Sequence, residues 1–164
     1  MPDNFSELAR AAKSAPVDAA SLATDLRRNV RGEVRFDDGT RALYATDGSN
    51  YRQVPIGVVL PRDDEDVIAA ISLARKYGAP ILCRGGGTSL AGQCCNVAVV
   101  LDMSKYMATI LDVDPVQRLA RVQPGVILDH LRNAAEKRHS RSLHDRRHDR
   151  QQLLRRPLRY GRQD

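Results

Sequence analysis

The sequence has no segment that would place the chain in or across a membrane. Its 164 residues contain no apolar run near the roughly 18–20 residues that a membrane-spanning helix needs. The first five residues have neither the basic region nor the apolar region of a signal peptide. Cysteine is also scarce: Cys83, Cys94 and Cys95 form an odd set without a C-x-x-C spacing, which excludes a disulfide framework and a zinc site. We therefore expect a cytoplasmic protein with reduced thiols and no membrane span.

Acidic residues are fewer than basic ones, but only at one end of the chain. The net charge is +6. Residues 1–138 hold 18 basic and 17 acidic side chains, whereas residues 139–164 hold eight arginines and three aspartates. An arginine-rich tail is typical of nucleic-acid-binding proteins, so one interpretation is a basic nucleic-acid-binding protein that uses this tail. Its histidines, His139, His144 and His148, could also be taken for a metal-binding tract.

The first third of the chain has helical and turn signals. Residues 5–28 are rich in alanine and leucine and predict one or two short helices, with Ser21 as an N-cap. Residues 33–51 contain two turn signals, Asp38-Gly39 and Asp47-Gly48, which predict a hairpin or an irregular loop.

Apolar runs and periodicity define the next elements. Residues 54–60 form an apolar run that predicts a strand, and residues 80–83 and 97–101 predict two short buried strands. Between them, the four acids of Asp63 to Asp66 begin an amphipathic helix that ends before Gly78. Because these acids point in different directions around a helical turn, we expect a solvated N-terminus rather than a metal site.

The body ends in a predicted hairpin and helix. Residues 109–113 and 119–122 flank Asp114-Pro115 as the two strands, and residues 127–135 have helical spacing. His130 on this helix is expected at the surface rather than as a catalytic base. The order of elements predicts an α+β fold with a βαβ start.

A glycine-rich segment, Arg84 to Gln93, lies between two of the predicted strands. Three successive glycines let the backbone approach a ligand, and successive N–H groups in such a turn form an anion-binding nest. The Thr88 and Ser89 hydroxyls and the Arg84 cation add to a site that suits a pyrophosphate. No Gly-Lys-Ser/Thr follows and the segment leads into a strand, so it is neither a Walker A nor a Rossmann motif.

Together with Val54-Pro55, Leu101-Asp102-Met103-Ser104 and Val122 to Val126, this segment resembles the FAD-linked oxidases of the vanillyl-alcohol-oxidase type, which have a PCMH-type FAD-binding domain. The FAD-binding polypeptide of glycolate oxidase and D-lactate dehydrogenase are the most similar members. The resemblance covers about residues 44–138 and implies the N-terminal half of a PCMH-type domain. In relatives with covalent flavin a histidine often stands at the position of Thr88, so the resemblance implies non-covalent FAD.

The resemblance also implies the cofactor-binding residues, while Tyr51 is a possible cofactor neighbour. They are Arg84, Gly85, Gly86, Gly87, Thr88, Ser89, Leu90, Gly92, Gln93, Pro124, Gly125 and Val126. No catalytic residue is expected in this chain, because the family's substrate-oxidising residues follow later.

The tail departs from the family's glycine- and asparagine-rich continuation. Codons chosen for Arg146 to Arg155, read one base later, encode Gly-Gly-Met-Ile-Gly-Asn-Asn-Ser-Cys-Gly, which is the family's flavin-contacting segment. The hypothesis is a truncated chain with a frameshift near Arg138. The expected organisation is an N-terminal extension over residues 1–43, a partial FAD domain over 44–138 and an out-of-frame, disordered tail over 139–164. The expected function is an FAD-binding fragment of an oxidoreductase for a 2-hydroxy acid such as D-lactate or glycolate, inactive as this chain, without nucleic acid as a partner.

Overall fold

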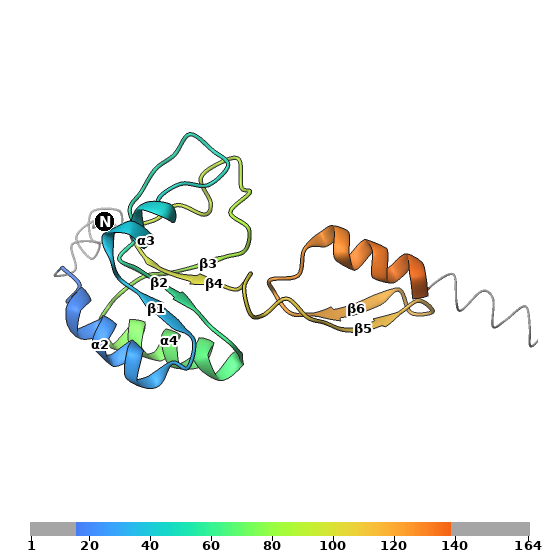
Figure 1. The fold of residues 1–164 in the computed structure, drawn as a ribbon, viewed down its shortest axis with the longest axis horizontal. Coiled ribbons are helices and arrows are strands. Elements are labelled where there is room, and N and C mark those ends of the chain that lie inside the picture. The colour runs from blue at the N-terminus through green and yellow to red at the C-terminus, as the bar shows by residue number, and fades with distance from the viewer. Residues whose placement is uncertain (1–15, 139–164) are drawn as a thin grey trace, which may run out of the picture. The chain divides into compact units, whose positions relative to one another are not determined.

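A computed structural model describes residues 16–138 of the chain (Figure 1). The tail from residue 139 and most of the helical segment predicted from residue 5 lie outside these residues. The chain divides into two compact units at Ala108 and Thr109, and we call their described parts unit 1 (residues 16–108) and unit 2 (residues 109–138).

Unit 1 is built on a four-stranded sheet in the order β1-β2-β4-β3. The strands are β1 (Glu33–Arg35), β2 (Gly57–Leu60), β3 (Ile81–Arg84) and β4 (Val99–Asp102). β2, β4 and β3 run parallel, and β1 is antiparallel to β2. The central strands β2 and β4 are buried throughout, as their valine-rich sequences predict. β3 lies at the sheet edge and is only half-buried, so the prediction of a buried strand there was wrong.

Helices α2 (Ala19–Asn29) and α4 (Asp64–Lys76) cover one face of this sheet (Figure 1). Their apolar side chains, such as Leu22 and Leu26, pack with Val59, Val99 and Leu101 into the main core. The α2 N-cap is Asp18, whose carboxylate accepts a hydrogen bond from the Ser21 N–H at 3.1 Å. Ser21 therefore lies inside the helix, and its prediction as the cap was wrong.

The other face of the sheet has a smaller cover. Val58, Leu60 and Val100 pack there against Tyr44, Leu82 and Tyr106. A short helix, α3 (Asp38–Leu43), contacts β2 and leads into Tyr44. The Asp38-Gly39 pair opens this helix instead of forming a turn, because the Asp37 carboxylate caps it by accepting from the Thr40 N–H at 2.8 Å.

The four acids before α4 do not share one environment. Asp63 is the N-cap and accepts from the Asp66 N–H at 3.1 Å, as expected for a helix start. Asp66 is only 2% exposed, and its two oxygens accept from the N–H groups of Arg31 at 2.8 Å and Arg62 at 2.9 Å. The expectation of a fully solvated helix N-terminus was therefore wrong at Asp66, whose carboxylate joins two chain segments.

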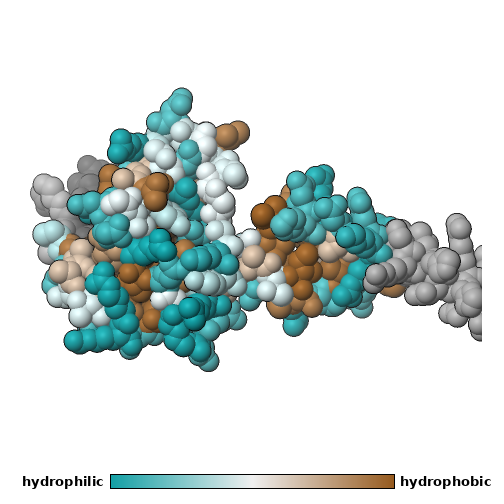
Figure 2. All heavy atoms as spheres, viewed as in Figure 1, coloured by the Kyte–Doolittle hydropathy of each residue, from teal (hydrophilic) through white to brown (hydrophobic). Residues whose placement is uncertain are grey.

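Unit 2 contains the predicted hairpin and helix. Strands β5 (Ile110–Asp114) and β6 (Leu119–Val122) pair antiparallel. The Asp114 carboxylate caps their turn by accepting from the N–H groups of Val116 and Gln117. A helix follows over residues 128–138, and apolar side chains of this unit form exposed brown patches in Figure 2.

The α+β fold with its βαβ start, β2-α4-β3, is confirmed. The predicted boundary after residue 43 lies inside unit 1, since β1 pairs with β2 and α2 packs on α4. Within residues 16–138, no helix is long and apolar enough to span a membrane.

Candidate functional site

The glycine-rich loop (residues 85–98) connects β3 to β4, which are parallel neighbours. Such a connection must return from the carboxyl end of one strand to the amino end of the next and usually contains a helix. Here irregular backbone makes the return, and no helix is present in the loop. The loop therefore starts at the carboxyl ends of the parallel strands, where open α/β sheets bind ligands.

The first part of the loop offers unpaired backbone donors. The N–H groups of residues 85–90 donate to no acceptor in the described part of the chain. A Cβ atom at Gly85 would have no atom within 4 Å, and one at Gly86 would meet only the Thr88 side chain at 3.8 Å. Successive free N–H groups on backbone without side chains fit an anion such as a pyrophosphate.

Two other glycines are required by conformation and close packing. Gly87 has φ +65° and Gly92 has φ +76°, in the left-handed region that other residues rarely adopt. A Cβ at Gly87 would collide with the Arg84 guanidinium, and one at Gly92 would lie 2.7 Å from the Tyr51 ring. These two residues fix the shape of the loop, whereas Gly85 and Gly86 keep its surface open.

The polar side chains of the loop divide into two kinds. Thr88 is exposed, so its hydroxyl can reach a ligand. Ser89 and Gln93 instead bond to each other, and the Ser89 Oγ accepts from the Gln93 N–H at 3.2 Å. Leu90 is 82% exposed and presents an apolar surface between them.

The Arg84 side chain turns toward backbone. Its Nη1 donates to the carbonyl of Thr46 at 2.9 Å, to that of Tyr44 at 3.3 Å and to that of Cys94 at 3.4 Å. The guanidinium also lies 5.1 Å from the centre of the Tyr44 ring. The charge predicted for the anion site is thus used to hold three segments together.

Asp47 is a residue of this site that the sequence prediction missed. Its Oδ1 accepts from the Ser49 N–H at 2.8 Å and from the Ser49 hydroxyl at 2.5 Å, and its Oδ2 accepts from the Cys94 N–H at 3.2 Å. These bonds, the Ser49 hydroxyl first, lower the pKa of Asp47 to about 2. The Asp47-Gly48 pair reads locally as a turn, and no local signal reveals a bond to a residue 47 positions later.

The second predicted cofactor segment, Pro124-Gly125-Val126, forms a turn in unit 2 between β6 and the following helix. The Val126 N–H donates to the Gln123 carbonyl at 3.2 Å. Gly125 is buried and Pro124 is exposed.

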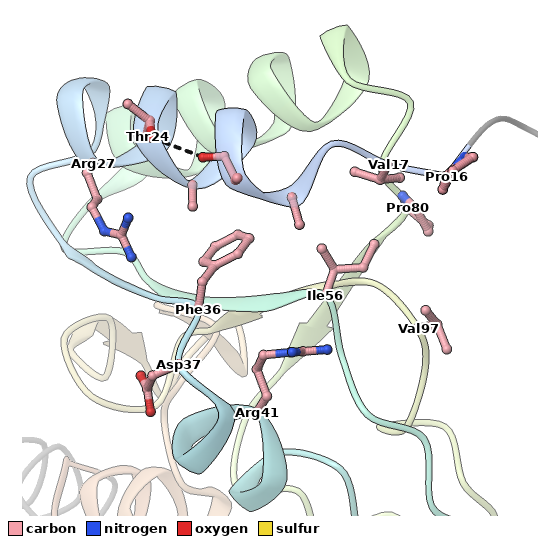
Figure 3. Close-up of a pocket in the computed structure, with 13 residues that line it drawn as sticks. Pro16, Val17, Thr24, Arg27, Phe36, Asp37, Arg41, Ile56, Pro80 and Val97 are labelled. Carbon is pink, nitrogen blue, oxygen red and sulfur yellow. Dashed lines mark hydrogen bonds between the residues drawn. The ribbon is translucent and has the colours of Figure 1, made fainter.

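A cavity of about 1040 Å³ lies elsewhere in unit 1, between α2 and α3. In Figure 3, Phe36 and Ile56 stand between α2 and Arg41, with Arg27 at one end. The Arg41 Nε donates to the Pro55 carbonyl at 2.8 Å. None of residues 84–94 lines the cavity, so it is separate from the glycine-rich loop.

The other candidates give no second centre. Among the residues that the structure describes, no group of three or more metal-ligating side chains could hold a metal ion. The three cysteines are free, and His130 is exposed. The tail histidines are not part of the described structure.

Comparison with known proteins points to one family. The family of the FAD binding domain matches residues 55–146, more than half of the chain. The chain is 38% identical over 112 residues to D-2-hydroxyglutarate dehydrogenase from Pseudomonas putida, covering 66% of this chain and 11% of that protein. It is 40% identical over 114 residues to glycolate oxidase subunit GlcD from Escherichia coli K12, covering 67% and 23%.

A solved structure of p-cresol methylhydroxylase with bound substrate matches the fold with a TM-score of 0.63 at 20% identity, covering 73% of this chain and 24% of that one. The chain therefore spans at most about a quarter of the length of these relatives.

Proposed function

This chain belongs to the FAD-linked oxidases with a PCMH-type FAD-binding domain, and we propose that it forms the pyrophosphate-binding part of a flavin-dependent oxidoreductase acting on a 2-hydroxy acid. FAD is the cofactor of this family. The names of its relatives, a D-2-hydroxyglutarate dehydrogenase and a component of glycolate oxidase, support a substrate with a hydroxyl beside a carboxylate.

The observation that carries the proposal is the row of free N–H groups over residues 85–90. We propose that these donors bind the FAD pyrophosphate, with the Thr88 hydroxyl as a further donor. Gly85 and Gly86 let the phosphates approach the backbone, and Ser89 and Gln93 close the loop around them. Leu90 and Gly92 border this surface, Arg84 and Gly87 shape it, and Pro124, Gly125 and Val126 contribute a second contact with the cofactor.

When bound, FAD supplies the acceptor for the hydride that leaves the hydroxyl-bearing carbon of the substrate. The residues of this chain bind and orient the cofactor's phosphates. We propose that they leave proton transfer and substrate binding to segments that this chain does not contain, that FAD is held without a covalent bond, and that the chain alone oxidises neither D-lactate nor glycolate. A dye-reduction assay with both substrates tests this, and turnover by the purified chain would contradict it.

Titration of the purified chain with FAD, followed by flavin fluorescence, tests the main proposal. The Gly85→Val variant should lose at least about tenfold in FAD affinity, because its side chain would project into the open space over the N–H groups. Its free energy of unfolding should stay within about 0.5 kcal/mol of the parent, since that space holds no protein atom. The matched control Gly39→Ala, in α3, should change neither quantity. A parent chain that binds no FAD, or a Gly85→Val variant that binds it equally well, would refute the proposal.

We also propose that the tail after about Arg138 is read in a shifted frame. Sequencing the gene decides this, since the corrected frame should encode the family's Gly-Gly-Met-Ile-Gly-Asn-Asn segment. Close relatives that encode the arginine-rich tail in frame would overturn the proposal.

A further inference from the structure

The peptide group of Cys94, where the glycine-rich loop turns back toward β4, is held from both sides by charged side chains. Its N–H donates to the Asp47 Oδ2 at 3.2 Å, and its carbonyl accepts from the Arg84 Nη1 at 3.4 Å. We call this pair of side chains the clamp. A cation and an anion thus meet one peptide of the loop, although they lie 37 positions apart in the sequence.

Each member of the clamp is itself anchored. The Arg84 guanidinium donates to the Thr46 carbonyl at 2.9 Å and lies over the Tyr44 ring. The Tyr44 hydroxyl donates to the Asp102 carboxylate at 2.5 Å, at the end of β4. Because Arg84 ends β3 and Asp102 ends β4, the clamp is tied to the carboxyl ends of both strands.

The segment that carries Asp47 touches the loop at a second point. The Gly48 N–H donates to the Gly87 carbonyl at 3.0 Å. A Cβ at Gly48 would lie 3.0 Å from the Ser89 carbonyl oxygen, so the two backbones are in close contact. The loop is therefore fixed at residues 87 and 94, and the part between them includes the unpaired N–H groups of residues 88–90.

We infer that Asp47 and Arg84 are positioning residues for FAD: the clamp holds the glycine-rich loop so that its N–H groups converge on the pyrophosphate, and neither side chain contacts the cofactor. The inference rests on the proposed function and assigns Arg84 a different way of acting from a direct phosphate contact. A loop arranged before binding costs less to order when the ligand arrives.

The first arm of the test needs no cofactor. Backbone hydrogen exchange is measured in the parent chain and in Asp47→Asn, Asp47→Ala, Arg84→Lys and Arg84→Met. Each clamp variant should exchange faster over the loop while the buried strands β2 and β4 keep their protection. The asparagine and lysine variants retain the shape or the charge of the native side chain, so they report on the clamp if a larger change unfolds the unit. The matched control Asp129→Asn, on the exposed helix of unit 2, should leave the loop unchanged.

The second arm measures FAD affinity at several salt concentrations. Asp47→Asn should weaken FAD binding by about tenfold, as expected for one lost charge-assisted hydrogen bond. A charge that contacts the phosphates would be screened by salt, so Arg84→Met would then flatten the salt dependence of FAD affinity. The inference expects weaker binding with an unchanged salt dependence.

The outcomes separate the two proposals. Absence of FAD binding by the parent chain refutes the proposed function and the clamp's role in binding, while the exchange data still decide whether the clamp orders the loop. Binding by the parent with equal affinity in Asp47→Asn and unchanged loop exchange overturns the clamp alone. A flattened salt dependence in Arg84→Met overturns the positioning role of Arg84 in favour of direct contact.

Discussion

Unit 1 and unit 2 bury their apolar side chains to very different extents. Unit 1 contains 17 buried hydrophobic residues, whereas Val113 is the single one in the described part of unit 2. In unit 2, Leu119 is 62% exposed and Leu128 is 65% exposed. Two strands and one helix have too little volume to enclose a core, so the pairing of β5 with β6 depends on its backbone bonds and its capped turn.

The difference bears on function because the glycine-rich loop belongs to the unit with the complete core. Both strands that flank the loop take part in the sheet of unit 1, and β4 is buried throughout. The clamp is likewise made within unit 1. A loop attached to a closed core can keep its donors arranged before any ligand binds, which a loop on unit 2 could not do to the same degree.

The largest expected effect comes from opening the core of unit 1. Leu26 is fully buried between α2 and the sheet, and we expect Leu26→Ala to lower the free energy of unfolding by about 2–5 kcal/mol. Leu128→Ala in unit 2 should change it by no more than about 0.5 kcal/mol, because that side chain is mostly exposed. Urea denaturation measures both. Equal losses in the two variants would show that the units do not differ as their burial indicates.

A smaller effect is expected at the buried carboxylate of Asp66. Asparagine at this position keeps one acceptor but places an N–H₂ group against the N–H of Arg31 or Arg62, so one of these donors loses its partner. We expect Asp66→Asn to cost about 1–3 kcal/mol. Asp64, exposed in the first turn of the same helix, provides the matched control, and Asp64→Asn should cost less than about 1 kcal/mol. Thermal unfolding that ranks the two variants in the reverse order would contradict a connecting role for Asp66.

The sequence predicted those parts of the molecule that depend on local pattern. The apolar runs located β2 and β4, and the acids before α4 marked its start. The glycine-rich segment was recognised because its residue types alone imply open backbone. Asp47 and the buried state of Asp66 were missed, since each depends on N–H groups brought close by the fold. Arg84 was recognised as a cation near the loop, but its three carbonyl partners come from segments that only the tertiary structure assembles.

The smallest expected effect is a pH dependence confined to unit 1. Glu33 on β1 accepts hydrogen bonds from Lys105 and, at 2.6 Å, from the Tyr106 hydroxyl, and these bonds lower its pKa to about 2. A carboxyl group whose pKa is lower in the folded than in the unfolded chain stabilises the fold above its unfolded pKa of about 4.3. This contribution is lost as the pH falls from about 4.3 toward 2. It should be at most about 1 kcal/mol, because the ion pair lies near the surface.

Stability measured by denaturation at each pH should therefore be nearly constant from about pH 8 to 5 with respect to this group and decline below it. Glu33→Gln should lower stability at neutral pH and make the decline shallower. Hydrogen exchange should assign the acid effect to β1 and β2, which pair at Glu33 and Leu60, and not to the helix over residues 128–138. Loss of protection in that helix over the same pH range, with β1 unaffected, would mean that acid acts first on unit 2. The contrast in burial between the units would then not extend to their response to acid.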